Sequence, residues 1–172
     1  MNEAIQNMLT RRSCRSYRPD MVAPELLEQV LQAGAWAPSA MNRQPVKVVA
    51  LRDPGEIREL EKMNAAVLGS PESHPFYGAP VVLVVLAENL PTAVEDGSLV
   101  MENLMLAAHS LGLGSCWINR AREEFKSPEG KALLKKWGLK EDMVGVGHCI
   151  LGWPAGELPA PKARREGFAV LR

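Results

Sequence analysis

The strongest limit on the fold comes from one apolar run, Pro80–Ala87. From Val81 onward the run contains only Val, Leu and Ala, so no polar side chain interrupts it. A strand with one solvated face would carry polar residues at every second position, because successive side chains point to opposite faces. The run therefore predicts a strand that is buried on both faces.

Other segments carry the patterns of strands and helices. Runs rich in apolar residues predict three further strands, at Val46–Leu51, Ser115–Asn119 and Met143–Gly152. Apolar residues at helical spacing predict helices that end near Thr10, begin at Pro24 and at Pro54, and cover about Val94–Leu111 and Ser127–Trp137. The Val94–Leu111 helix is apolar around most of its circumference, which indicates burial in the domain or against another subunit.

The length and composition indicate one globular domain. The 172 residues contain no linker or repeat, so we expect a single α+β domain over residues 1–172. The 20 basic and 20 acidic side chains balance, which gives no support to nucleic-acid binding or to a membrane-surface role. No segment has the pattern of a signal peptide or of a membrane span. Three cysteines without metal-like spacing indicate free thiols in a reducing compartment, by default the cytoplasm.

Two basic clusters stand out in this net-neutral sequence. Arg11, Ser13 and Arg15 would point to one side of an extended segment, and Lys162 and Arg164 are likewise two residues apart. Guanidinium and ammonium groups with a hydroxyl between them suit a phosphate, which accepts several charge-assisted hydrogen bonds at once. Two interpretations stay open at this point: a shared phosphate site, and a solvated basic surface.

The loop Pro38–Pro45 contains the other candidate ligand contacts. Asn42 and Gln44 each carry donors and acceptors, which is what reading the edge of a heteroaromatic ring requires. Local turn bonds made by the Asn and Ser side chains are an equally open interpretation.

No pattern in the sequence indicates a catalytic triad, a metal site or paired carboxylates, so we name no catalytic side chain and no metal. His109 and His148 lie in apolar segments and are expected to be core histidines. Cys14, between arginines, is the one candidate for a redox-sensitive thiol.

Four blocks, in this order, resemble the nitroreductase family of flavoproteins: Arg11–Tyr17, Pro38–Pro45, Gly112–Ile118, and Leu151–Pro154 leading to Lys162–Arg164. The blocks reach from one end of the sequence to the other, and the chain looks like a short member of the family. The resemblance implies an α+β fold with a mixed sheet flanked by helices, a central buried helix and an intertwined homodimer. It also implies FMN bound at the dimer interface.

The resemblance assigns roles to individual residues. It implies that the FMN phosphate and ribityl chain are bound by Arg11, Arg12, Ser13 and Arg15, with Lys162 and Arg164 closing on the phosphate. It implies that the partner subunit supplies the residues along the flavin ring: Pro38, Ser39, Met41, Asn42 and Gln44. It places beside the ring the segment Trp117, Ile118 and Asn119, which continues to Arg120. Contacts to the pyrimidine edge of the ring are not assigned, and Asn64 and Glu72 are the nearest candidates.

The implied activity is that of an oxidoreductase in which the flavin carries the chemistry. NAD(P)H would reduce FMN, and a small acceptor such as a nitroaromatic or a quinone would then take the electrons in a ping-pong cycle. Two alternatives remain: a flavin-binding, flavin-cleaving or dehalogenase-type protein on the same fold, and a non-enzymatic nucleotide-binding module. The sequence does not indicate the physiological acceptor or a preference between NADH and NADPH.

Overall fold

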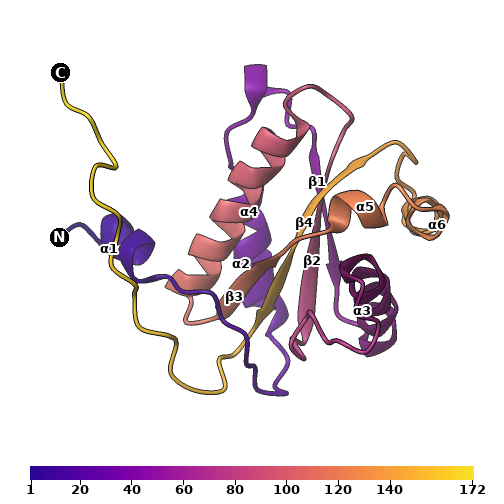
Figure 1. Ribbon diagram of the computed structural model, residues 1–172, viewed down its shortest axis with the longest axis horizontal. Helices are drawn as coiled ribbons and strands as arrows, with labels where there is room; N and C mark the ends of the chain where they lie inside the picture. The colour runs from indigo at the N-terminus through magenta and orange to yellow at the C-terminus, as the bar shows by residue number, and fades with distance from the viewer.

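A four-stranded sheet forms the centre of the protein, which a computed structural model describes over residues 1–172 (Figure 1). Its strands are β1 (Val46–Leu51), β2 (Val81–Ala87), β3 (Gly114–Ile118) and β4 (Val144–Gly152). They lie in the order β1-β2-β4-β3, so that β2 and β4 are central and β1 and β3 form the two edges. The α+β class expected from the sequence is therefore correct.

Helices cover both faces of the sheet. The helices are α1 (Glu3–Thr10), α2 (Pro24–Ala35), α3 (Pro54–Leu68), α4 (Ala93–Ser110), α5 (Ala121–Glu124) and α6 (Pro128–Lys136), with a 3-10 turn η1 (Ala40–Asn42). On one side of the sheet lie α2 and α4, and on the other lie α3, α5 and α6 (Figure 1). The sheet is thus the middle layer of three.

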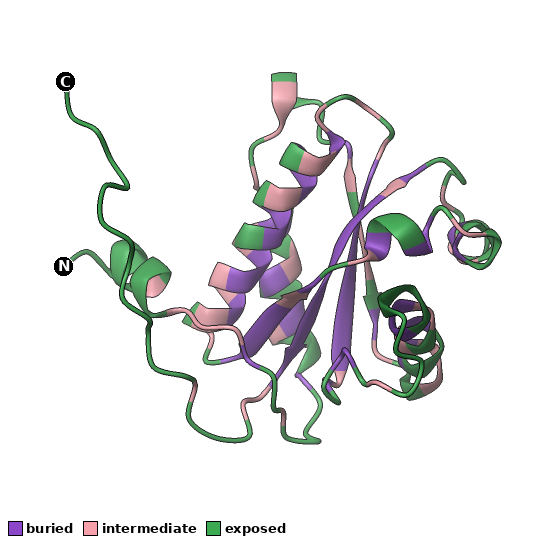
Figure 2. Cartoon of the chain, viewed as in Figure 1, coloured by how far each residue is buried: buried purple, intermediate pink, exposed green.

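The central strand β2 has no solvated face. All of its residues are fully buried, and they alternate between two separate cores. Val81, Leu83 and Val85 pack with α2 and α4, whereas Val82, Val84 and Leu86 pack with α3 and the segments beyond it. This arrangement confirms the prediction from the apolar run, and Figure 2 shows the buried strands between half-exposed helices (Figure 2).

The direction of the strands corrects one expectation. All three strand pairs are antiparallel, and the only parallel pairing is an isolated bridge between Ser13 and Ser115. The mixed sheet is therefore limited to that bridge. The antiparallel direction of β2 follows from the path of the chain after β1. Helix α3 and residues 69–80 bring the chain back to the end where β1 stops, so β2 starts beside that end and Leu51 lies opposite Val82.

Helix ends follow local signals. The Asp53 side chain accepts hydrogen bonds from the amides of Gly55 and Glu56 at the start of α3, and Gly69 ends that helix at φ 74°. The short helix α5 was not predicted, because four residues are too few to show a helical period. Of all the helices, none combines the length and apolar character that crossing a membrane would require.

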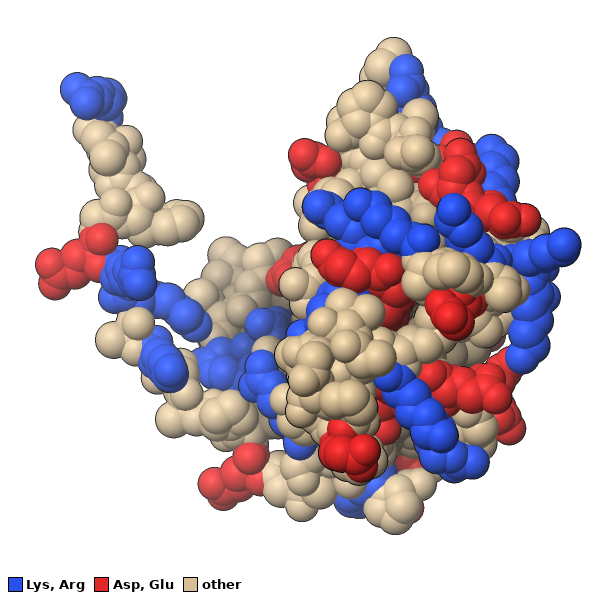
Figure 3. All heavy atoms as spheres, turned by 45° about the vertical axis from the view of Figure 1, so that its right-hand side comes forward, with Lys and Arg blue, Asp and Glu red and all other residues tan.

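The two ends of the chain leave apolar side chains in solvent. Helix α1 buries none of its residues, and Ile5, Met8 and Leu9 are each at least half exposed. The tail after β4 forms no helix or strand, and Phe168 is 98% exposed. Figure 3 shows this tail standing away from the rounded body, with basic side chains along it (Figure 3).

We predict that Gly145→Ala destabilises the fold by about 1–3 kcal/mol, the usual cost of overpacking a core. A β-carbon at Gly145 in β4 would collide with the backbone carbonyl of Ala121, which no rotamer change can move. Urea unfolding should report a lower midpoint than for Gly156→Ala, where a β-carbon meets nothing within 4 Å. Equal midpoints for the two variants would contradict the packing of α5 on β4.

Candidate functional site

The N-terminal basic segment lies along the free edge of β3. The amide of Cys14 donates to the carbonyl of Ser115 at 2.9 Å, and Ser13 bridges Ser115. Farther on, the amide of Arg18 donates to the carbonyl of Trp153 at 2.9 Å, beyond the end of β4. Backbone pairing at both ends therefore fixes the path of this segment on the sheet.

Close packing beneath the segment determines the state of Cys14. Its thiol is 2% exposed, donates to the carbonyl of Ser16 at 3.2 Å, and occupies the space that a β-carbon on Gly114 would need. A redox sensor needs solvent access, so the burial of Cys14 speaks against this residue as the candidate redox-sensitive thiol. The hydroxyl of Tyr17 donates to the carbonyl of Cys14 at 2.8 Å, and burial raises the pKa of that phenol.

Arg11 and Arg12 carry donor atoms that have no partner within the chain. Nη1 of Arg11 and Nε of Arg12 are buried without a hydrogen bond. Leaving a buried cationic donor unpaired is costly, so an anion bound here would gain charge-assisted hydrogen bonds from both residues. Arg12 is held in position by hydrogen bonds from its Nη1 to the carbonyls of Leu9, at 2.9 Å, and of Arg11, at 2.7 Å.

His109 lies close to the positive charges of Arg11 and Arg12. It is half-buried on α4, and its Nε2 lies 2.8 Å from the hydroxyl of Thr10. Burial lowers the pKa of the imidazole, and the nearby Arg11 and Arg12 lower it further. The histidine is therefore not enclosed in the core as expected, but stands at the border of a cationic site.

A cavity of about 480 Å³ opens beside the basic segment. Its lining includes Arg15, three residues predicted to run beside a ring (Trp117, Ile118 and Asn119), and Arg120. A second hollow of about 360 Å³ is lined by residues 13–16 and by the first part of the tail, residues 155–159. Arg15 borders both hollows and Ser13 borders the second, so these two predicted phosphate contacts lie next to the predicted ring contacts, whereas Arg11 and Arg12 line neither hollow.

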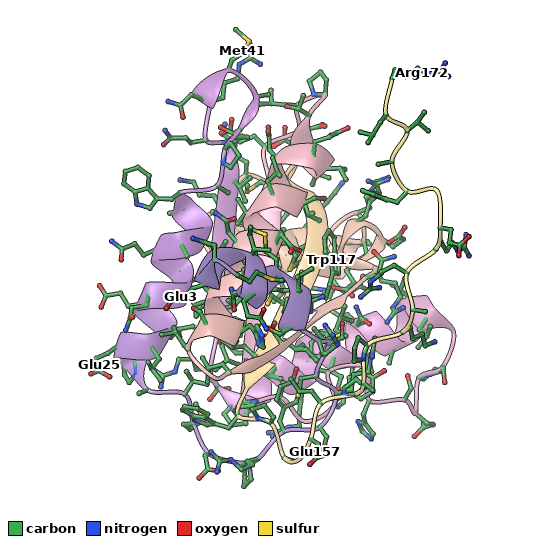
Figure 4. The ribbon with its side chains drawn as sticks, turned by 90° about the vertical axis from the view of Figure 1, so that its left-hand side faces the viewer. Glu3, Glu25, Met41, Trp117, Glu157 and Arg172 are labelled. Atoms are coloured by element: carbon green, nitrogen blue, oxygen red, sulfur yellow. The ribbon has the colours of Figure 1, made fainter.

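The loop of η1 lies at another end of the molecule. Figure 4 places Met41 at one tip and Trp117 near the middle, so one chain does not bring the two together (Figure 4). Buried Asp96 on α4 accepts a hydrogen bond from the amide of Ala40 at 2.8 Å and thereby anchors the loop. The side chain of Gln44 donates to that of Asn42 at 3.0 Å.

The loop has further internal contacts. The amide of Gln44 donates to the hydroxyl of Ser39 at 2.9 Å, and Pro38 and Ser39 line an apolar hollow of about 280 Å³ with residues of α2 and β1. Lys162 and Arg164 lie in the exposed tail and form no hydrogen bond within the chain, so the structure does not place them against Arg11. A role for these residues requires a second chain or a movement of the tail.

Left-handed backbone conformations concentrate in these segments. The five non-glycine residues with positive φ are Met41, Asn42, Gln44, Tyr77 and Arg120. The first three belong to the loop of η1, and the other two line the cavity. Strained backbone of this kind tends to occur at functional sites, so its distribution marks the loop and the cavity as candidate functional segments.

Two candidates for mid-chain ligand contacts are placed elsewhere. Asn64 is fully buried and donates to the carbonyl of Asn119 at 2.9 Å, so it lies behind the cavity and does not line it. Glu72 borders another hollow, of about 520 Å³, which shares Ser73 and His74 with the cavity. Leu68 and Tyr77 also line the cavity, and no motif in the sequence marks either of them as a ligand contact.

Comparison with known proteins identifies the family. The Nitroreductase family matches residues 8–77 and 68–153. A relative from Archaeoglobus fulgidus, named provisionally as an NADH dehydrogenase/NAD(P)H nitroreductase, is 32% identical over 91% of this chain and 88% of its own. An FMN reductase [NAD(P)H] from Bacillus subtilis is 27% identical over 99% of this chain and 73% of its own.

A solved structure agrees with this assignment over the whole chain. A nitroreductase with bound FMN from Bacteroides fragilis has a TM-score of 0.91 and 30% identity, with 100% of both chains covered. A nitroreductase with bound FMN from Desulfitobacterium hafniense has a TM-score of 0.89 and 26% identity, again over 100% of both chains. The chain belongs to the nitroreductase family.

Acidification is predicted to destabilise the fold through His109. Its pKa is lower in the folded chain than the ordinary value of about 6.5, so the unfolded state binds the proton more readily. Stability should therefore be lost as the pH falls through about 6.5 toward the folded pKa. Urea unfolding over this pH range should show a smaller loss for His109→Gln.

The same shift can be measured directly. An NMR titration of the His109 ring, assigned with His109→Gln, should give a pKa below that of free histidine, and Arg11→Gln should raise it. A pKa at or above the ordinary value would contradict the cationic environment described for Arg11 and Arg12.

Proposed function

We propose that the protein is an FMN-dependent NAD(P)H oxidoreductase that reduces a small acceptor. The observation that carries the proposal is the pair of buried, unpartnered donors of Arg11 and Arg12, in the same basic segment whose Arg15 lines a cavity with Trp117. Two structural relatives of the whole chain bind FMN. Other relatives are named for FMN reductase and NADPH-flavin oxidoreductase activities.

The residues present fit the two chemical ends of FMN. Arg11, Arg12, Ser13 and Arg15 supply guanidinium and hydroxyl donors for the phosphate and ribityl chain, and unpaired buried donors gain most from such an anion. The wall formed by Trp117, Ile118 and Asn119 provides the apolar surface and backbone groups for the ring. The cavity of about 480 Å³ lies within the range of cofactor sites.

The site is completed by a second copy of the chain. Met41 at the tip of its loop lies away from the cavity of its own chain, and no loop residue lines that cavity. In this proposal a partner subunit supplies the loop residues Pro38, Ser39, Met41, Asn42 and Gln44 to the ring. The exposed apolar face of α1 and the exposed Leu99 on α4 offer a surface for a homodimer. Packing of the tail on that partner would bring Lys162 and Arg164 to a phosphate.

The chemistry divides between cofactor and chain. When bound, FMN supplies hydride and electron transfer between NAD(P)H and an acceptor such as a nitroaromatic or a quinone. The chain binds and orients, and its cations and backbone amides stabilise negative charge in the cavity. No nucleophile or general acid is required of any side chain. The three cysteines are free and buried, which supports a reducing compartment such as the cytoplasm for this single domain of residues 1–172.

The purified protein is predicted to bind one FMN per chain, and Arg11→Ala and Arg164→Ala to weaken that binding. Loss of one hydrogen bond to a charged group costs about 1.5–3 kcal/mol, or roughly 10- to 100-fold in Kd. Quenching of FMN fluorescence measures the affinity. Arg122→Ala, an exposed arginine on α5, is the matched control and should bind as the unmodified chain does. Unchanged affinity in both test variants would mean that the phosphate binds elsewhere.

Turnover should consume NAD(P)H in proportion to added acceptor and leave FMN intact. Absorbance at the nicotinamide band measures the consumption of NAD(P)H, and chromatography of the released flavin shows whether FMN is intact. Loss of FMN during turnover would instead indicate a flavin-cleaving protein. A colourless protein that fails to bind FMN at saturating concentration would leave only a nucleotide-binding module without redox activity.

A further inference from the structure

Three polar side chains are buried together behind the cavity wall. Asn64 on α3, Glu124 on α5 and His148 on β4 each have no exposed surface. Burial of polar groups is unfavourable unless each finds a partner, and a well-packed apolar cluster would serve the core at least as well. The trio therefore requires an explanation other than stability.

The side chains form a connected chain of hydrogen bonds. Nε2 of His148 lies 2.7 Å from Oε2 of Glu124, and the other carboxylate oxygen accepts from the amide of Asn64. The ring of His148 packs edge-on against Phe76, with ring centres 5.3 Å apart, and so has no freedom to turn away. Glu124 in turn fixes which way the Asn64 amide points.

Asn64, at one end of this series of hydrogen bonds, holds Arg120. Nδ2 of Asn64 donates to the carbonyl of Asn119 at 2.9 Å, and Oδ1 of Asn64 accepts from Nε of Arg120 at 3.0 Å. The buried side chain of Asn64 thus hydrogen-bonds both to the backbone before Arg120 and to the guanidinium of Arg120.

The backbone at Arg120 is strained, so the hydrogen bonds from Asn64 stabilise a conformation that is otherwise unfavourable. Its φ of 83° lies in the left-handed region that residues with a β-carbon rarely adopt. Such conformations persist where the surroundings over-determine them, and here the contacts with Asn64 do so. The two Nη atoms of Arg120 donate no hydrogen bond within the chain, and the residue lines the cavity with Arg15.

We propose that Asn64, Glu124 and His148 are positioning residues that hold Arg120 as a fixed cation at the cavity wall, and that Arg120 raises the reduction potential of the flavin bound there. The inference rests on the proposed function, because it requires FMN in this cavity. A cation held close to the ring favours the redox state with more negative charge, and its effect is greatest where the cation cannot move away. The network supplies that rigidity.

The primary test compares Arg120→Gly with Arg120→Lys in FMN-loaded protein. Glycine adopts positive φ without strain, so Arg120→Gly removes the charge and keeps the backbone. Dye equilibration measures the midpoint potential. We expect Arg120→Gly to lower the ratio of reduced to oxidised flavin at least about tenfold, which is about 30 mV for a two-electron couple. Arg120→Lys should recover part of this shift, and Arg122→Ala should leave the potential unchanged.

The role of the buried trio is tested with Glu124→Gln, alone and combined with Arg120→Gly. If Glu124 acts through Arg120, Glu124→Gln lowers the potential in the unmodified background, whereas beside Arg120→Gly only the rise caused by loss of the carboxylate charge remains. A residue with only a structural role would lower the urea midpoint and leave the potential of the folded, FMN-loaded variant unchanged, which would overturn the positioning role.

The outcomes separate this inference from the proposed function. If the unmodified chain does not bind FMN, the proposed function fails. If FMN binds and Arg120→Gly retains the unmodified potential, the proposed function stands and the role of Arg120 is overturned. The Arg120 variants give this answer even if Glu124→Gln does not fold, because Arg120 is only partly buried.

Discussion

The burial of β2 on both faces governs where a ligand can meet this protein. Two layers of helices close the sheet from above and below, so binding groups can gather only at its edges and ends. The basic segment uses one such edge, where Cys14 pairs with Ser115 on β3. The cations proposed to bind the phosphate and the wall of β3 proposed to face the flavin ring are neighbours because this pairing places them on the same edge.

Much of the fold follows from signals that act over a few residues. Asp53 and Pro54 begin α3 and Gly69 ends it, because each favours the backbone of a helix terminus by its own chemistry. Strand direction has no comparable local signal. The antiparallel pairing of β1 with β2 depends on how far α3 and residues 69–80 carry the chain back, which is decided by packing.

The candidate site divides in the same way. Arg11 to Arg15 and Trp117 could be assigned to one site from the sequence through the family resemblance, and of these Ser13, Arg15 and Trp117 border the two hollows that share Arg15. The linkage from His148 to Arg120 could not, because its partners are 24 to 60 positions apart and no spacing rule connects them. The only sign of this linkage in the sequence is the polar Asn64 on the apolar face of a helix. The sequence suggested that Asn64 contacts a ligand, whereas in the structure it is buried and holds Arg120.

The separation of Met41 from Trp117 within one chain has a thermodynamic consequence. If the two halves of each site come from different chains, cofactor binding and chain association are linked, and each strengthens the other by mass action. Dilution would then loosen the cofactor, and abundant cofactor would hold the subunits together at concentrations where the chains alone would separate. The stability of the assembled enzyme would be set jointly by the amounts of protein and of flavin that surround it.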